Sequence, residues 1–178
     1  MKQSTTLGHL FEKTWKSIES ALRRKGFNTI IIESERALRK FIYDKIPDNC
    51  IVGLGNSLSS SALKIRDILL EKGNRVYYSW NGDSYNRSMD NFEEHPVPEF
   101  FLTTADSITS EGRLINYEFS GSAASKHNYP KNIIAFSEIA SLNKRPSERN
   151  MTSDFVVFDK KPNEAEITVA LLPFNKAS

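Results

Sequence analysis

Apolar residues at helical spacing mark three segments of the chain. In the first, at about residues 5–25, they recur every three or four positions: Leu7, Leu10, Phe11, Trp15, Ile18 and Leu22. This spacing places one apolar stripe along an amphipathic helix, which the following glycine ends. Similar patterns predict helices over about residues 35–46 and 60–71, the former stopped by a proline and the latter closed by a glycine. The polar segments 83–95 and 120–127 admit short helices.

Short apolar runs, several rich in β-branched residues, predict strands between and after these helices. They cover about residues 27–32, 50–54, 75–80, 100–103, 114–117, 132–136, 154–159 and 166–172. Strands alternate with helices through the first half, which favours a mainly parallel sheet covered on both faces. The later strands are closer together and can pair antiparallel. We therefore predict a single α/β domain over residues 1–178, with a mixed, mainly parallel sheet flanked by helices.

Composition narrows the class of protein. The 178 residues include 24 basic and 22 acidic side chains, a near balance that gives no case for nucleic acid. The single cysteine, Cys50, cannot form an internal disulfide or hold an iron–sulfur cluster, which needs about four thiolates. The three histidines lack metal-ligand spacing, so no metal site is expected. Neither a signal peptide nor a run of ~20 apolar residues is evident, which predicts a cytoplasmic protein without a membrane partner.

A glycine- and serine-rich segment follows the predicted strand 50–54. It contains Gly53, Gly55, Asn56, Ser57, Ser59 and Ser60. Glycine allows a tight turn and close approach of the backbone to a ligand, and serine can cap the next helix and present hydroxyls. Free N–H groups at a helix start favour phosphate or carboxylate. The segment predicts a small-anion site, and the alternative is a tight turn with a serine cap.

A second polar segment follows the predicted strand 100–103. Asp106 and Glu111 bring two carboxyl groups into one loop, and Thr104 and Thr109 add hydroxyls. A turn that brought the carboxyl groups together could shift one pKa and support acid–base catalysis. The alternative is structural: an Asx turn at Asp106 and a β-turn at Glu111 and Gly112.

Both segments resemble motifs of the LUD (lactate utilization) domain family, of which the chain looks like a divergent member. The family shows Gly-x-Gly-x-Ser-x-Thr after a strand, and residues 53–59 match it with Ser59 in place of threonine. Residues 105–114 resemble the later alanine-aspartate motif, although Ser110 holds the usual glutamate position and Glu111 follows it. A further family phrase is replaced by Gly121-Ser122-Ala123.

The resemblance implies a NagB/RpiA/CoA transferase-like fold and a link to bacterial L-lactate utilization through the LutC-type subunit. It also implies partner subunits that carry iron–sulfur centres, while this chain holds no cofactor.

Three functions compete at this point. The first is an accessory or regulatory subunit that binds a small anion at residues 53–61. The second is a free-standing enzyme on a phosphorylated, CoA-ester or acyl substrate, with Asp106 or Glu111 as acid or base. The third is a protein-interaction domain without a ligand.

Overall fold

Three helices are present in the part of the chain that the computed structural model describes, which is residues 3–55, 58, 65–78, 98–116, 130–138, 156–162 and 165–172. They are α1 (Gln3–Arg24), α2 (Glu35–Lys45) and α3 (Ile65–Glu71), and each overlaps a segment where helical spacing predicts a helix. No helix among the described residues is long and apolar enough to cross a membrane. The segments 83–95 and 120–127 lie outside the described residues.

The ends of the helices follow from local chemistry. The Ser34 hydroxyl accepts a hydrogen bond from the backbone N–H of Ala37 at 3.2 Å and so caps the start of α2. The same helix stops because Ile46 is extended, the conformation favoured before Pro47. After α1, Gly26 takes a φ of +87°, which turns the chain back towards the first strand.

The central sheet is parallel throughout its six strands, in the order β1-β9-β7-β4-β2-β3. These strands are β1 (Asn28–Ile31), β2 (Ile51–Leu54), β3 (Arg75–Tyr78), β4 (Phe100–Thr104), β7 (Asn132–Glu138) and β9 (Glu166–Leu172). The predicted α/β class is confirmed. The antiparallel pairing expected of the later strands occurs in a separate three-stranded sheet, formed by β5 (Ser107–Ile108), β6 (Leu114–Asn116) and β8 (Val156–Phe158). Strand β5 falls in a segment where the sequence predicts only a loop.

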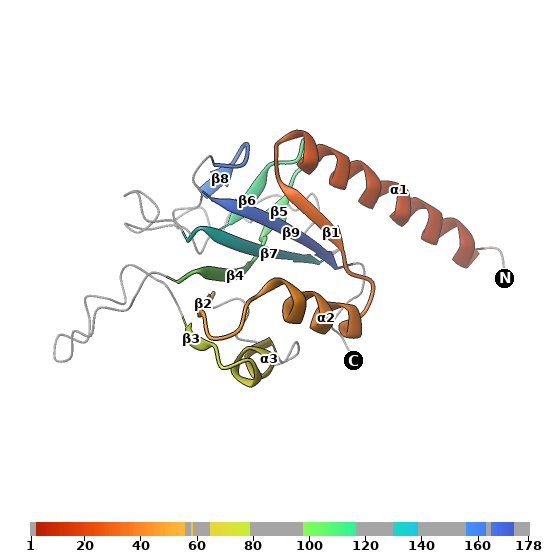
Figure 1. Ribbon diagram of the computed structural model, residues 1–178. Helices are drawn as coiled ribbons and strands as arrows, with labels where there is room; N and C mark the ends of the chain where they lie inside the picture. The colour runs from red at the N-terminus through yellow and green to blue at the C-terminus, as the bar shows by residue number, and fades with distance from the viewer. Residues whose placement is uncertain are drawn as a thin grey trace.

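Two apolar clusters fill the space on either side of the parallel sheet. Helices α2 and α3 pack on one face with alternate strand residues such as Leu102 and Ile134. Helix α1 and the small sheet pack on the other face, against the intervening residues such as Phe101 and Ile133. Figure 1 shows α2 and α3 below the sheet, with α1 and β5, β6 and β8 above it. This alternation is the period-two pattern of strands buried on both faces.

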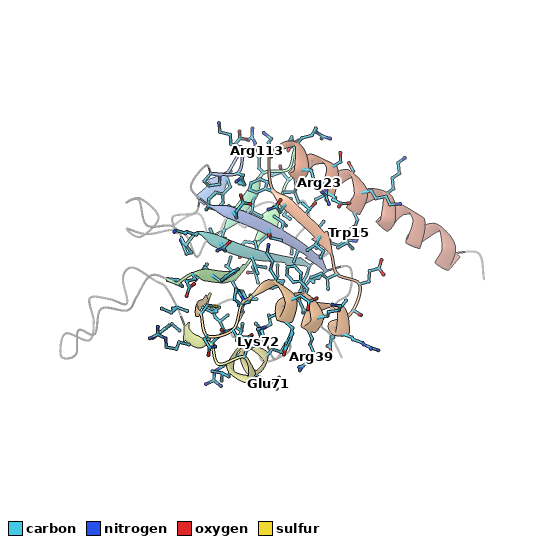
Figure 2. All side chains as sticks on the ribbon, viewed as in Figure 1. Trp15, Arg23, Arg39, Glu71, Lys72 and Arg113 are labelled. Atoms are coloured by element: carbon cyan, nitrogen blue, oxygen red, sulfur yellow. The ribbon has the colours of Figure 1, made fainter. Side chains whose placement is uncertain are left out.

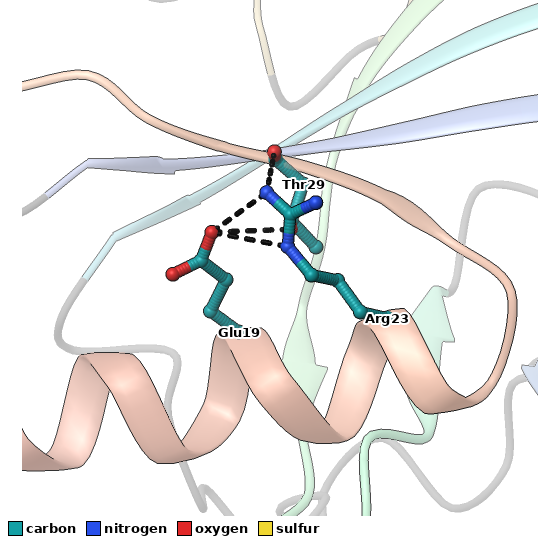
Figure 3. A network of polar contacts seen from close by, with 3 residues as sticks. All are labelled: Glu19, Arg23 and Thr29. Atoms are coloured by element: carbon teal, nitrogen blue, oxygen red, sulfur yellow. Dashed lines mark hydrogen bonds and ion pairs between the residues drawn. The ribbon is translucent and has the colours of Figure 1, made fainter.

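Strand β1 is an outer strand of the parallel sheet, and α1 covers part of its free edge. The Arg23 guanidinium bonds the Thr29 carbonyl at 3.1 Å and the Glu19 carboxylate at 2.8 Å (Figure 3). An unpaired backbone carbonyl on an edge strand can pair with another chain, and a charged side chain placed over it opposes such pairing. Figure 2 labels Arg23 at the end of α1 that leads into β1.

Candidate functional site

The predicted anion segment begins at the carboxyl end of β2, beside β4. The backbone N–H of Gly55 donates to the Leu102 carbonyl at 2.8 Å, and the Leu58 N–H donates to the Gly55 carbonyl at 3.0 Å. The chain therefore turns immediately after β2 while still bonded to β4. Asn56, Ser57, Ser59 and Ser60 lie outside the described residues.

Gly53, also predicted as a ligand contact, has a packing role within β2. A Cβ at this position would lie 2.8 Å from Cδ2 of Phe101 and 3.3 Å from Cγ of Pro98. Phe101 is buried and has little room to move. Glycine is therefore required here by the neighbouring strand, whatever ligand the following turn binds.

Thr104 ends β4 next to this turn. Its strand is bonded to β2 on one side and to β7 on the other, and the Ala105 N–H continues the ladder to the Phe136 carbonyl at 2.7 Å. Thr104 is partly exposed. The structure thus brings Gly55 and Thr104, from two separate predicted motifs, to adjacent strand ends.

The connections that leave β2 and β4 run to opposite faces of the sheet. After β2 the chain leads to α3, whose Ile65, Ile68 and Leu69 pack with α2. After β4 it leads to β5, whose Ile108 packs on the face covered by α1. Adjacent parallel strands whose connections diverge in this way define a topological switch point, the usual ligand position in open α/β sheets.

Three buried polar side chains lie near these strand ends on the face covered by α1. They are Thr103, Asn116 and Ser137, with exposed fractions of 0%, 1% and 0%. The Asn116 amide donates to Thr103 Oγ1 at 3.1 Å and to the Thr104 carbonyl at 2.6 Å, which links β6 to the end of β4. Asn116 and Ser137 were not predicted as site residues. The sequence signal that could have marked them is a polar residue in or next to an otherwise apolar predicted strand.

The two predicted carboxylates lie at opposite ends of strand β5. Asp106 precedes it, is partly buried, and donates its backbone N–H to the Ile115 carbonyl at 3.0 Å. Glu111 is exposed in the turn between β5 and β6, where the Gly112 N–H donates to the Thr109 carbonyl at 3.0 Å. The β-turn considered from the sequence is therefore present, and the hairpin does not bring Asp106 and Glu111 together.

The environment of Glu111 favours its charged form. Hydrogen bonds from the hydroxyls of Ser110, at 2.8 Å, and Thr109 lower the pKa of this carboxyl group below its ordinary value. The Thr109 hydroxyl also accepts from the Arg113 N–H at 3.2 Å, so it belongs to the turn. A solvated carboxylate with a lowered pKa is a weak base at neutral pH.

The tip of this hairpin is held against α1. Gly112 has a φ of +82°, and a Cβ there would lie 2.6 Å from the Ala21 backbone carbon. Helix α1 ends soon after Ala21 and leads into β1, so the tip lies towards the amino end of the parallel sheet. Glu111 and Thr109 are thus separated from the strand ends where Gly55 and Thr104 lie.

Cys50 lies just before β2, at the amino end of that strand. Its side chain is buried in the apolar cluster under α2 and α3, and burial raises the pKa of the thiol. Cys50 therefore packs as a small apolar residue of this cluster. Within the described ranges, no group of three or more histidine, cysteine, aspartate or glutamate side chains could hold a metal ion.

Fold and site together define an α/β protein with polar groups gathered at the carboxyl ends of central parallel strands. A family model described as the LUD domain matches residues 16–148. The chain belongs to the LUD domain family. The crystal structure of a DUF162 family protein from Deinococcus radiodurans, at 1.70 Å resolution, superposes with a TM-score of 0.60 at 12% identity. The match covers 92% of this chain and 98% of that one. No curated protein matches the chain.

Proposed function

We propose that this LUD-family protein binds a small organic anion where β2 and β4 end, as an accessory or regulatory protein of bacterial L-lactate utilization. The observation that carries the proposal is the topological switch point between β2 and β4, with Gly55 on one strand end and Thr104 on the other. Ligands of open α/β sheets bind where neighbouring connections diverge.

The groups at this position suit an anion of modest charge. A glycine turn lets the backbone approach the ligand closely, and hydroxyl groups can donate to carboxylate or phosphate oxygens. Asp106 follows β4 and Glu138 ends the adjacent strand β7. Carboxyl groups on neighbouring strand ends disfavour a compact, multiply charged anion through Coulomb repulsion. A carboxylate, or a phosphate on a larger organic molecule, fits this balance better than a free phosphate ion.

The accessory role is supported by family and composition together. Lactate utilization as a process transfers electrons, and a chain with one cysteine lacks the thiolates for an iron–sulfur cluster. We therefore propose that iron–sulfur subunits act as partners and that this chain works beside them in the cytoplasm. Glu111 lies away from the strand ends, so in the enzymatic alternative acid–base work at this site belongs to Asp106.

A thermal-shift screen tests the proposal. Wild-type protein and the variants Gly55→Val and Glu111→Gln are melted with phosphate, ribose 5-phosphate, coenzyme A, L-lactate and pyruvate. A ligand at ~100 times its dissociation constant adds about 2.7 kcal/mol to the free energy of unfolding. We expect an organic anion to stabilise the wild type and Glu111→Gln, and to leave the melting temperature of Gly55→Val unchanged.

The ligand-free melting curves serve as the folding control. A cooperative transition in ligand-free Gly55→Val separates loss of binding from loss of fold. If a ligand still raises the melting temperature of Gly55→Val, the site lies away from the strand ends. If no ligand raises the melting temperature of the wild type, the result favours a protein-interaction domain without a ligand. Loss of the shift in Glu111→Gln would instead place the ligand at the hairpin tip.

A further inference from the structure

The hydroxyl of Ser137 is buried without a hydrogen-bond partner among the described residues. Ser137 lies one residue before the end of β7 and has an exposed fraction of 0%. Its Oγ makes no hydrogen bond within the part of the chain that the structure describes. A polar group removed from water without a partner destabilises a fold, and most buried polar atoms in native proteins are paired.

The neighbours of Ser137 connect it to the proposed anion site. Thr103 pairs with Ala135 across β4 and β7, so Ser137 is the next residue on the same face and lies diagonally from Thr103. On the other side of β4, Gly55 lies level with Thr103, because its N–H donates to the Leu102 carbonyl. Gly55, Thr103 and Ser137 therefore form a row across three adjacent strand ends, and the member on β2 has no side chain.

The chemistry of this row is uncharged. Thr103 and Ser137 carry hydroxyls, and the Asn116 amide donates to Thr103 Oγ1 and to the Thr104 carbonyl of β4. A serine hydroxyl both donates and accepts, so it suits a hydroxyl or carbonyl oxygen as well as a carboxylate. Asn116 already links the small sheet to β4, whereas no hydrogen bond to a described residue accounts for the burial of the Ser137 hydroxyl.

We propose that Ser137 is a ligand-binding residue whose hydroxyl bonds a hydroxyl or carbonyl oxygen of a small organic anion. The charged group of that anion lies at Gly55 and Thr104, so the inference rests on the proposed function and narrows its ligand class. Ser137 makes the site selective for anions that carry such an oxygen over bare anions with the same charged group.

Isothermal titration calorimetry with two matched probe pairs tests this selectivity. L-lactate and acetate share a carboxylate, and ribose 5-phosphate and inorganic phosphate share a phosphate; only the first member of each pair carries alcohol hydroxyls. The variants are Ser137→Ala, Gly55→Val and the control Thr168→Val. Thr168 is also buried in the sheet, with an exposed fraction of 6%. It lies on the face covered by α2 and α3, as Ala170 two residues further along β9 does, and so on the opposite face from Ser137.

We expect Ser137→Ala to weaken the hydroxylated member of at least one pair about tenfold, roughly what one hydrogen bond to a ligand contributes. Acetate and inorganic phosphate should bind it as they bind the wild type, and Thr168→Val should bind every probe like the wild type. Gly55→Val should weaken both members of the pair. Ser137→Cys, which keeps the size of the side chain and weakens the hydrogen bond, should fall between wild type and Ser137→Ala.

Three results would overturn the inference. Wild-type affinity of Ser137→Ala for every probe would remove Ser137 from the site while leaving the anion site standing. Equal loss for both members of each pair would assign Ser137 to the charged group or to the fold. No binding of any probe to the wild type would overturn the proposed function and this inference together. Should Ser137→Ala fail to melt cooperatively, the same criteria apply to Ser137→Cys.

Discussion

The two ends of the parallel sheet are built in different ways. At the amino end, charged side chains are paired across elements: Arg113 and Lys25 with Asp159 at 2.9 and 3.3 Å, and Lys161 with Glu166 at 2.9 Å. At the carboxyl end, the Ser137 hydroxyl is buried and makes no hydrogen bond among the described residues. Asn74, at the amino end, also has a buried unpaired Nδ2, but its side chain still accepts from the Cys50 N–H at 2.9 Å through Oδ1. The first end joins α1, the hairpin and β8 to the sheet. The carboxyl end contains a buried hydroxyl that makes no hydrogen bond within the described part of the fold, which is typical of a functional position.

The largest effect on stability is expected at the hairpin tip. In Gly112→Ala, the new Cβ meets the α1 backbone at 2.6 Å, and the φ of +82° strains any residue with a side chain. Strain and overpacking together should lower the free energy of unfolding by about 3 kcal/mol, as measured by urea denaturation. Gly26→Ala is the matched control. It has a φ of +87°, but its nearest atom lies at 3.5 Å, so only the strain of about 1 kcal/mol remains.

Equal costs for these two glycine variants would show that the tip is not held against α1. Anion binding by Gly112→Ala in its folded state should match the wild type, because the tip lies away from the strand ends. A loss of binding in this variant would break the division between the two ends of the sheet.

Two substitutions at the carboxyl end of the sheet are expected to have smaller and contrasting effects on stability. Asn116→Ala removes two hydrogen bonds to β4, of 3.1 and 2.6 Å, and should cost about 2 to 3 kcal/mol of unfolding free energy. Ser137→Ala removes a hydroxyl that makes no hydrogen bond to any residue the structure describes, so it should change the free energy of unfolding by less than about 0.5 kcal/mol or raise it. Urea unfolding of both variants measures the contrast. A cost for Ser137→Ala as large as that for Asn116→Ala would show that the hydroxyl stabilises the fold.

The sequence predicts the framework of the molecule well because its patterns are long or sharply ended. The spacing from Leu7 to Leu22 determines a helix wherever it packs, and Pro47 ends α2 by backbone sterics alone. Strands buried on both faces appear as continuous apolar runs, which is how β4 and β9 could be recognised. Strand β5 was missed because two residues, Ser107 and Ile108, are too short to show a period.

The candidate site was predicted in part. The sequence indicates which residues belong to it, but which of them lie together depends on the order of the strands in the sheet. Gly55 and Thr104 are visible as motif residues, but only the pairing of β2 with β4 makes them neighbours. Asp106 and Glu111 are close in sequence, and the β5–β6 register separates them. Ser137 gains its meaning from its partner strands, because the face on which a strand residue lies is known only when the sheet is assembled.

The smallest effect is a pH-dependent one at the amino end, from the carboxylate of Glu166. Lys161 donates a hydrogen bond to it at 2.9 Å, which is the main reason that its pKa lies below the ordinary 4.5, and Asn28 donates another at 2.8 Å. A carboxyl group with a lowered folded-state pKa contributes stability that is present above pH 4.5 and is lost as the pH falls through the folded-state pKa.

Because the Glu166 side chain is 56% exposed, Glu166→Gln should lower the free energy of unfolding by at most about 0.5 kcal/mol at neutral pH. In urea unfolding measured over a series of pH values, the gap between wild type and Glu166→Gln should close on acidification below 4.5. A gap that stays constant with pH would mean that the carboxylate contributes through the shape of its hydrogen bonds rather than through its charge.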